Sequence, residues 1–94
     1  MKTVVVLNNI RSLYNVGSIF RTSDALGIDK LYLCGITGTP ENPRLHKTAL
    51  AGLQTVAWDY KKSALRTVKD LKKAGYYVVG IEISPTSTPV KPIP

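Results

Sequence analysis

The fold of this chain is decided by residues 9–27, which read NIRSLYNVGSIFRTSDALG. They follow Thr3–Leu7, a continuous apolar and largely β-branched run that predicts a strand buried on both faces, as in a parallel sheet. Apolar side chains then recur at helical spacing, which predicts a helix over Val16–Leu26 with Asn15 as its N-cap. A second apolar run, Lys30–Cys34, completes a strand–helix–strand unit, and such units are right-handed.

The rest of the sequence continues this alternation. A loop rich in Gly, Thr and Pro is followed by a short helix, a short strand, a longer helix and a last strand, over residues 45–52, 55–58, 61–74 and 76–83. The longer helix has an apolar face made of Ala64, Leu65, Val68 and Leu71. The pattern predicts an α/β domain over residues 1–83, with a mainly parallel sheet and flanking helices. Residues 84–94 hold four prolines without periodicity and predict a tail or linker.

The composition is basic, with 13 Lys and Arg against 6 Asp and Glu and a net charge of +7. This balance favours a polyanionic partner, usually nucleic acid, although a merely solvated cationic surface has the same composition. Cys34 is the single cysteine and its apolar neighbours predict a buried thiol. His46 is the only histidine and has no second ligand at metal spacing, so we expect no metal site. We find no signal peptide or membrane-spanning run and expect a cytoplasmic protein with no membrane partner.

Polar residues gather around the first strand-to-helix junction. Asn9 and Arg11 follow the strand, Asn15 opens the predicted helix, and Arg21 lies nearly two turns inside it. Ligands bind at the carboxyl ends of strands in open α/β sheets, and a guanidinium suits a phosphate or a ribose hydroxyl. The alternative is that Asn15 merely caps the helix and that Arg21 is solvated.

Two further groups of basic residues are weaker candidates. Arg44, His46 and Lys47 form a basic loop edge suited to a phosphate backbone. The lysines of residues 61–74 read instead as the solvated face of a helix. No glycine-rich phosphate loop is present, which argues against an unrelated nucleotide-binding domain.

The junction resembles the first signature motif of the SpoU/TrmH family of RNA ribose 2′-O-methyltransferases, which use S-adenosylmethionine. The matching residues are Asn9–Ser12, Asn15–Thr22, Asp24-Ala25 and Gly27, and later Lys47–Ala49, Gly52, Val56–Trp58 and Leu71–Tyr76. The similarity covers nearly all of residues 3–83.

This resemblance implies 2′-O-methylation of ribose in tRNA or rRNA, with S-adenosylmethionine as cofactor, RNA as partner and a homodimer for full-length family members. It implies that Arg21 positions or activates the ribose 2′-hydroxyl, that Asn15 supports the same site, and that Arg11 faces the RNA. The substrate-binding residues that we predict are Asn9, Arg11, Arg44 and Lys47.

Two later motifs of the family are absent from the sequence: an apolar strand ending in Gly-Asn-Glu, and a segment containing Ser-Leu-Asn. In the family these motifs build the trefoil knot that holds the methyl donor. We therefore expect the N-terminal part of an α/β-knot domain with the knot missing, no cofactor-binding residue in this chain, and no activity from the chain alone. The alternative is a non-catalytic RNA-binding or assembly module derived from the substrate half.

Overall fold

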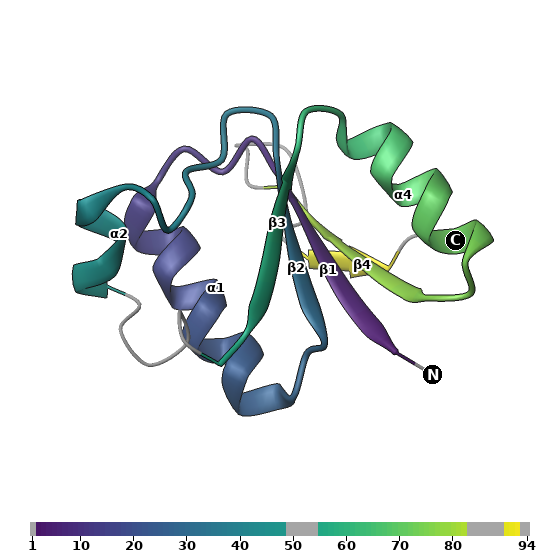
Figure 1. The fold of residues 1–94 in the computed structure, drawn as a ribbon, viewed down its shortest axis with the longest axis horizontal. Coiled ribbons are helices and arrows are strands. Elements are labelled where there is room, and N and C mark those ends of the chain that lie inside the picture. The colour runs from purple at the N-terminus through teal and green to yellow at the C-terminus, as the bar shows by residue number, and fades with distance from the viewer. Residues whose placement is uncertain (1, 49–54, 83–89, 93–94) are drawn as a thin grey trace.

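The computed structural model describes residues 2–48, 55–82 and 90–92. Strands and helices alternate along the chain (Figure 1). In order they are β1 (Thr3–Asn8), α1 (Leu13–Leu26), β2 (Lys30–Cys34), α2 (Pro43–Thr48), β3 (Ala57–Lys61), α4 (Ala64–Lys73), β4 (Tyr77–Ile81) and β5 (Val90–Pro92). No helix in these three ranges is long and apolar enough to cross a membrane.

The strands form one sheet in the order β3-β2-β1-β4-β5. β1 lies in the middle and pairs in parallel with β2 and β4, and β2 pairs in parallel with β3. The register places Val5 opposite both Leu31 and Val79. β5 pairs with β4 in the antiparallel direction. The predicted α/β fold with a mainly parallel sheet and flanking helices is confirmed.

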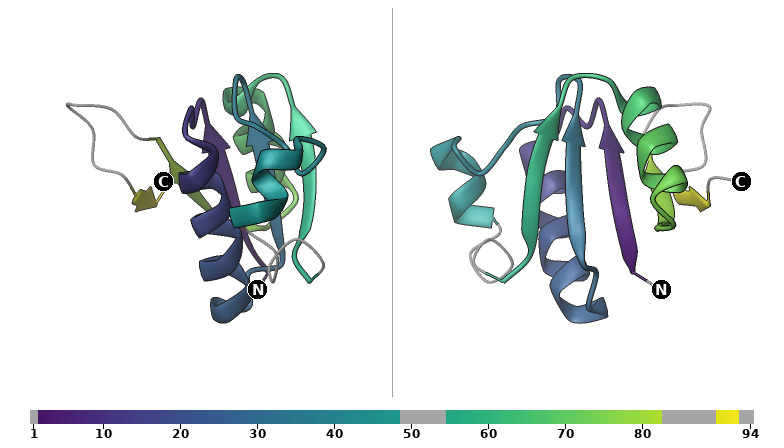
Figure 2. Two further views of the ribbon diagram at one scale, coloured as in Figure 1. Left: turned by 90° about the vertical axis from the view of Figure 1, so that its left-hand side faces the viewer. Right: turned by 45° about the vertical axis from the view of Figure 1, so that its right-hand side comes forward.

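Helices cover both faces of the sheet, α1 and α2 on one face and α4 on the other (Figures 1 and 2). Alternate residues of β1 pack into the cores on the two faces of the sheet, which is why the whole strand is apolar. The larger core lies under α1 and α2 and contains Val5, Leu7, Ile10, Val16, Phe20, Leu31, Leu33, Leu45 and Val56. The smaller core lies under α4 and contains Val4, Val6, Cys34, Leu71 and Val78, so the predicted burial of Cys34 is confirmed.

The first helix begins one turn earlier than the sequence predicted, and Asn15 is not its N-cap. Ser12 caps the helix: it has an extended backbone, and its Oγ accepts a hydrogen bond of 3.1 Å from the backbone N–H of Asn15. The additional turn brings Leu13 against the larger core, and that contact favours the earlier start. Asn15 therefore lies inside the first turn, so its side chain is not needed to cap the helix.

Other boundaries differ at the edge of the sheet. The strand predicted over residues 55–58 is β3, two residues further on. The helix predicted from residue 61 begins at Ala64, after the N-cap Ser63. Within it Leu65 is 69% exposed, because the helix rests on the sheet through Thr67 and Leu71 instead. The predicted apolar face was therefore wrong at Leu65.

Two segments lie partly outside the described residues. The short helix predicted over residues 45–52 is α2, and residues 49–54 are not described. Of the segment predicted as a tail or linker, residues 84–94, the structure describes 90–92, which form β5 at the edge of the sheet.

Candidate functional site

Three loops meet at one end of the sheet, because the carboxyl ends of β1, β2 and β3 all lie there (Figure 2). We call this end, with its loops, the loop edge. The first loop leads from β1 to α1, the second from β2 to α2, and the third from β3 to α4. The predicted site residues lie in or just beyond the first two loops.

Asn9 joins the first two loops. Its backbone is left-handed, with φ of 56°, and its Oδ1 accepts a hydrogen bond of 3.0 Å from the backbone N–H of Ile36. Its own N–H donates to the carbonyl of Cys34 at 3.2 Å. A Cβ atom at Gly35 would collide with the Asn9 side chain, so this approach requires glycine there. Asn9, which the sequence predicts to bind substrate, thus also joins the first two loops through its Oδ1.

The side chain of Thr37 also joins the first two loops by hydrogen bonds, a role that the sequence did not predict. Its buried Oγ1 accepts a hydrogen bond of 3.0 Å from the backbone N–H of Ile10. The same hydroxyl donates to two carbonyl oxygens, that of Cys34 at 2.7 Å and that of Leu7 at 3.2 Å. A Thr three residues after a strand in a polar loop is a recognised local signal for such bonds, but its long-range partners are not visible in sequence.

The two predicted catalytic residues both lie on α1 but not side by side. Asn15 and Arg21 are six residues apart, which is about 9 Å along the axis and about 120° around it. Asn15 is half-buried and Arg21 is exposed. One guanidinium nitrogen of Arg21, Nη2, donates to Ser18 Oγ at 3.1 Å. This bond turns the Arg21 side chain back toward the start of α1, and so toward the loop edge.

The predicted substrate-binding residues divide between the first two loops. Arg11 is exposed and follows the buried Ile10 in the β1–α1 loop. Arg44 is exposed at the start of α2, where its backbone N–H donates to Asn42 Oδ1 at 3.0 Å. Leu45 joins α2 to the core under α1, so Arg44 lies on the same face of the sheet as Arg21. Lys47 also lies in α2.

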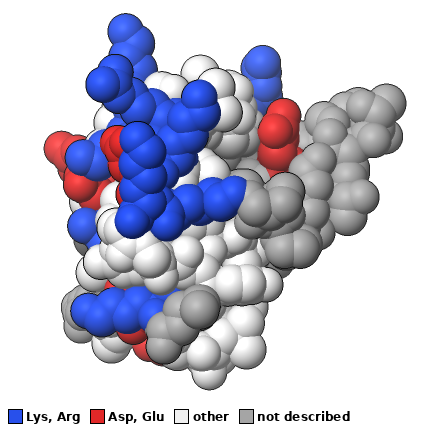
Figure 3. Space-filling view, turned by 90° about the vertical axis from the view of Figure 1, so that its right-hand side faces the viewer, with Lys and Arg blue, Asp and Glu red and all other residues white. Residues whose placement is uncertain are grey.

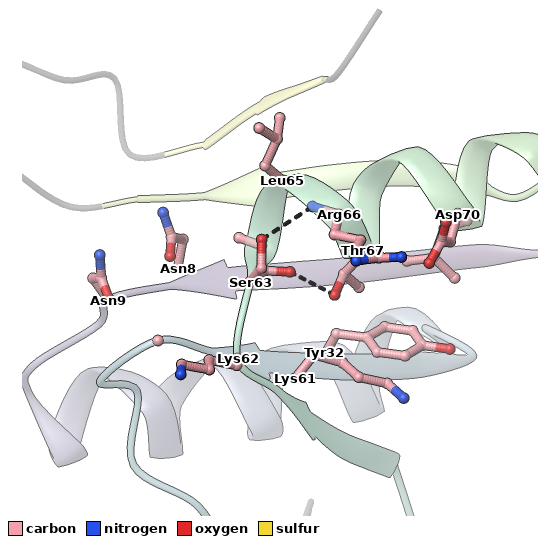
Figure 4. Close-up of a pocket in the computed structure, with 13 residues that line it drawn as sticks. Asn8, Asn9, Tyr32, Lys61, Lys62, Ser63, Leu65, Arg66, Thr67 and Asp70 are labelled. Atoms are coloured by element: carbon pink, nitrogen blue, oxygen red, sulfur yellow. Dashed lines mark hydrogen bonds between the residues drawn. The ribbon is translucent and has the colours of Figure 1, made fainter.

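A large hollow that the sequence did not predict lies on the other face, between the strand ends and α4 (Figure 4). We call it the α4 groove. It is an open groove of about 990 Å³, lined by Asn8, Asn9, Tyr32, Gly35, Lys61, Lys62, Ser63, Ala64, Leu65, Arg66, Thr67, Asp70 and Leu71. Three of these side chains are cationic and one is anionic. The groove therefore favours an anionic ligand.

Two hydrogen bonds fix the wall that α4 contributes to the α4 groove (Figure 4). Ser63 Oγ accepts from the backbone N–H of Arg66 at 3.2 Å, and Thr67 Oγ1 donates to the Ser63 carbonyl at 2.8 Å. Behind them, burial raises the pKa of the Cys34 thiol, against smaller opposing effects of Thr67 and Lys61. A protonated, buried thiol is a poor nucleophile, so we assign Cys34 no chemistry. The described residues contain no group of three potential metal ligands.

Comparison with known proteins relates nearly the whole chain to one family. The family described as "SpoU rRNA Methylase family" matches residues 2–93. A protein of Staphylococcus haemolyticus named "Putative TrmH family tRNA/rRNA methyltransferase" is 30% identical over 82 residues, 87% of this chain and 33% of that protein. The 23S rRNA (guanosine-2'-O-)-methyltransferase RlmB of Neisseria meningitidis is 26% identical over 81 residues, 86% of this chain and 32% of that protein. This chain thus spans about a third of the length of these relatives.

Solved structures share the fold. An rRNA methyltransferase from Sinorhizobium meliloti is similar with a TM-score of 0.73 at 23% identity, over 92% of this chain and 33% of that chain. The SpoU methyltransferase AviRb from Streptomyces viridochromogenes, in complex with the cofactor AdoMet, is similar with a TM-score of 0.67 at 19% identity, over 90% of this chain and 43% of that chain. At these identities the likeness establishes the fold.

Proposed function

Because this chain belongs to the SpoU rRNA methylase family, we propose that it serves in the 2′-O-methylation of ribose in tRNA or rRNA. In this proposal the chain contributes residues that face the RNA, and S-adenosylmethionine is the source of the methyl group. The relative RlmB is named for guanosine 2′-O-methylation, and the structural neighbour AviRb was solved with AdoMet. Both facts support the reaction class.

The observation that carries this proposal is the placement of Arg21. Its guanidinium is exposed, and the bond to Ser18 holds it toward the loop edge of the sheet. A ribose 2′-hydroxyl is a weak acid, and negative charge builds on its oxygen when it acts as a nucleophile. Arginine remains charged in proteins, so Arg21 acts as a hydrogen-bond donor to this developing charge or to the adjacent phosphate, and not as a base.

The remaining predicted residues position the RNA. Arg11, in the β1–α1 loop, and Arg44, at the start of α2, are exposed cations, and with Lys47 they suit phosphate contacts that fix the register of the RNA. Asn15, about one and two-thirds turns before Arg21, supports the same site from the first turn of α1. Asn9 orders the loop edge on which these residues stand, because its Oδ1 binds the second loop.

The described residues do not fit a methyl donor. Within them, every buried side-chain nitrogen and oxygen already has a hydrogen-bond partner, so none awaits an adenosine or an amino-acid group. The α4 groove is large enough for a ligand, but Lys61, Lys62 and Arg66 give it the wrong charge for a sulfonium cation. We therefore place the donor site outside the described residues and derive no catalytic step through the donor.

Calorimetry tests this placement of the donor site. We expect no measurable heat of binding when S-adenosylmethionine is titrated into the 94-residue chain. A micromolar dissociation constant, equivalent to about −8 kcal/mol, would contradict our placement of the donor site.

The alternative function is a non-catalytic RNA-binding or assembly module. The misfit of the donor to the described residues favours it, since such a module needs the basic surface and no donor site. The two functions differ in one observable, which is transfer of a methyl group to RNA.

Transfer is measured with tritiated S-adenosylmethionine and mixed tRNA and rRNA. The 94-residue chain is assayed alone and together with the separately produced carboxyl-terminal part of the Staphylococcus haemolyticus relative. We expect label in alkali-resistant dinucleotides in the combined sample, because a methylated 2′-oxygen cannot attack the neighbouring phosphate. RNA binding without label in either sample would instead support the non-catalytic module.

A further inference from the structure

The α4 side of the molecule carries a row of cations that the proposed reaction does not use. The row consists of Lys61 and Lys62 at the end of β3, and Arg66, Lys69 and Lys73 on α4. All five residues are exposed. The space-filling view of this side shows Lys and Arg side chains gathered over one part of the surface (Figure 3). We call this row the α4 cation row.

The cation row lines two hollows that share a wall. Lys61, Lys62 and Arg66 line the α4 groove. A smaller hollow of about 400 Å³ is lined by Arg66, Lys69 and Lys73, with Ser63, Leu65 and Asp70. Four residues, Ser63, Leu65, Arg66 and Asp70, line both hollows, so the two adjoin along the first turns of α4. The surface is therefore hollowed along the line of the charges.

These charges are poorly neutralised within the molecule. Lys61 lies 3.5 Å from Asp59, but both side chains are about half exposed. In the described part of the chain, no carboxylate lies within ion-pair distance of Lys62, Arg66, Lys69 or Lys73. Cations three and four residues apart on one helix face repel one another. A bound polyanion removes that repulsion, which a small anion at one end of the row cannot do.

The length and position of the row match a nucleic-acid strand. From Arg66 to Lys73 the helix rises about 10 Å, which corresponds to about three nucleotides at 3.4 Å each. The α4 groove also reaches Asn8 and Asn9, at the end of β1. The groove thus begins at the same loop edge toward which Arg21 is turned on the opposite face.

We propose that the α4 groove and the α4 cation row bind the sugar–phosphate backbone of an RNA strand that continues to the site near Arg21. This inference rests on the proposed function in one respect, namely that the substrate is RNA. It assigns the contacts to phosphates and not to bases, because four of the five cations are lysines, whose ammonium groups are point charges without a planar bidentate fork. It therefore predicts affinity without sequence preference.

The test compares two double variants that remove the same charge. In Lys62→Ala/Arg66→Ala both residues line the α4 groove. In the control, Lys2→Ala/Lys72→Ala, one residue precedes β1 and the other is on α4, but neither lines either hollow. Binding of a fluorescein-labelled single-stranded RNA is followed by anisotropy between about 50 and 200 mM salt. Circular dichroism and urea unfolding establish that each variant is folded.

We expect the groove variant to bind RNA about tenfold more weakly at low salt and the control less than about twofold more weakly. The slope of log affinity against log salt should fall by about 1.4 for the groove variant, about 0.7 for each lost phosphate contact. Equal weakening by both variants would mean that net charge alone attracts RNA, and would overturn the inference. Displacement of RNA by polyglutamate at equal charge would assign the surface to an acidic protein instead. None of these outcomes depends on methyl transfer, so a failed transfer assay bears on the proposed function alone.

Discussion

The α1 side and the α4 side of the sheet differ in how their charged side chains are held. On α1 the one cation, Arg21, is bonded to Ser18, and the one carboxylate, Asp24, accepts a 2.6 Å hydrogen bond from Thr55. On α4 four cations accompany one carboxylate, and most have no partner among the described residues. The first side suits chemistry that depends on the position of one group. The second suits attraction that depends on the number of charges.

The largest effect should come from the core under α1, which keeps that side rigid. Phe20 is fully buried there, whereas Leu71 is 7% exposed in the smaller core under α4. We expect Phe20→Ala to lower the free energy of unfolding by about 3–5 kcal/mol and Leu71→Ala by about 2 kcal/mol. Urea unfolding measures both, with Leu65→Ala as an exposed control. Equal losses would show that the two sides are equally packed.

The second test removes the positioned group itself. In the combined sample described above, Arg21→Ala should slow single-turnover methyl transfer about a hundredfold to a thousandfold, or about 3–4 kcal/mol, with RNA binding little changed. Arg21→Lys should restore little, because an ammonium lacks the planar fork. Lys72→Ala is the control on the opposite helix. A near-normal rate for Arg21→Ala would remove Arg21 from the site.

A smaller effect should follow from loosening the loop edge between the two sides. Thr37→Val keeps the shape of the side chain but deprives the Ile10 N–H and two carbonyls of their shared partner. We expect a loss of about 1–3 kcal/mol in the free energy of unfolding, because a buried donor remains unsatisfied. Thr37→Ser, which keeps the hydroxyl, should lose less. Hydrogen exchange of the Ile10 amide gives a local measurement, and unchanged protection in Thr37→Val would count against this hydrogen bond.

The smallest effect should come from single cations on the α1 side that contact phosphate. Arg11→Ala and Arg44→Ala should each weaken RNA binding about twofold to threefold and reduce the salt slope by about 0.7. These changes are smaller than that of the groove variant, which removes two charges from one row. If Arg11→Ala alone reduced RNA affinity as much as the groove variant does, the proposed difference between the α1 side and the α4 side would be wrong.

The sequence predicted the centre of the fold better than its edges. β2 has the predicted bounds and β1 extends the predicted strand by one residue, because strands buried on both faces leave an unbroken apolar run. β3 was displaced by two residues, since this edge strand is largely exposed and has a weak pattern. The starts of α1 and α4 were predicted wrongly. Ser12 caps α1 in place of the predicted Asn15, and Ser63 caps the helix predicted to begin at residue 61, because these serines accept hydrogen bonds from the first backbone N–H groups.

The candidate site was predictable only where its residues are local in sequence. The residues of the β1–α1 junction form one recognisable run, so its position at the loop edge could be expected. The α4 groove could not, because its lining joins residues 8–9 with residues 61–71 across more than 50 positions. The lysines there were interpreted as a solvated helix face, and only the sheet order places them around a hollow.

The central position of β1 has a consequence for the synthesis of this protein. β1 is made before β4, so the edge of β1 that pairs with β4 lacks this partner until β4 has left the ribosome, more than 70 residues later. At bacterial or eukaryotic elongation rates this interval is about 4–15 s. Throughout it, the run Thr3–Leu7 presents an apolar strand with unpaired backbone groups, the kind of segment that pairs with other chains. Until β4 arrives, this edge of the nascent chain is therefore open to pairing with other chains.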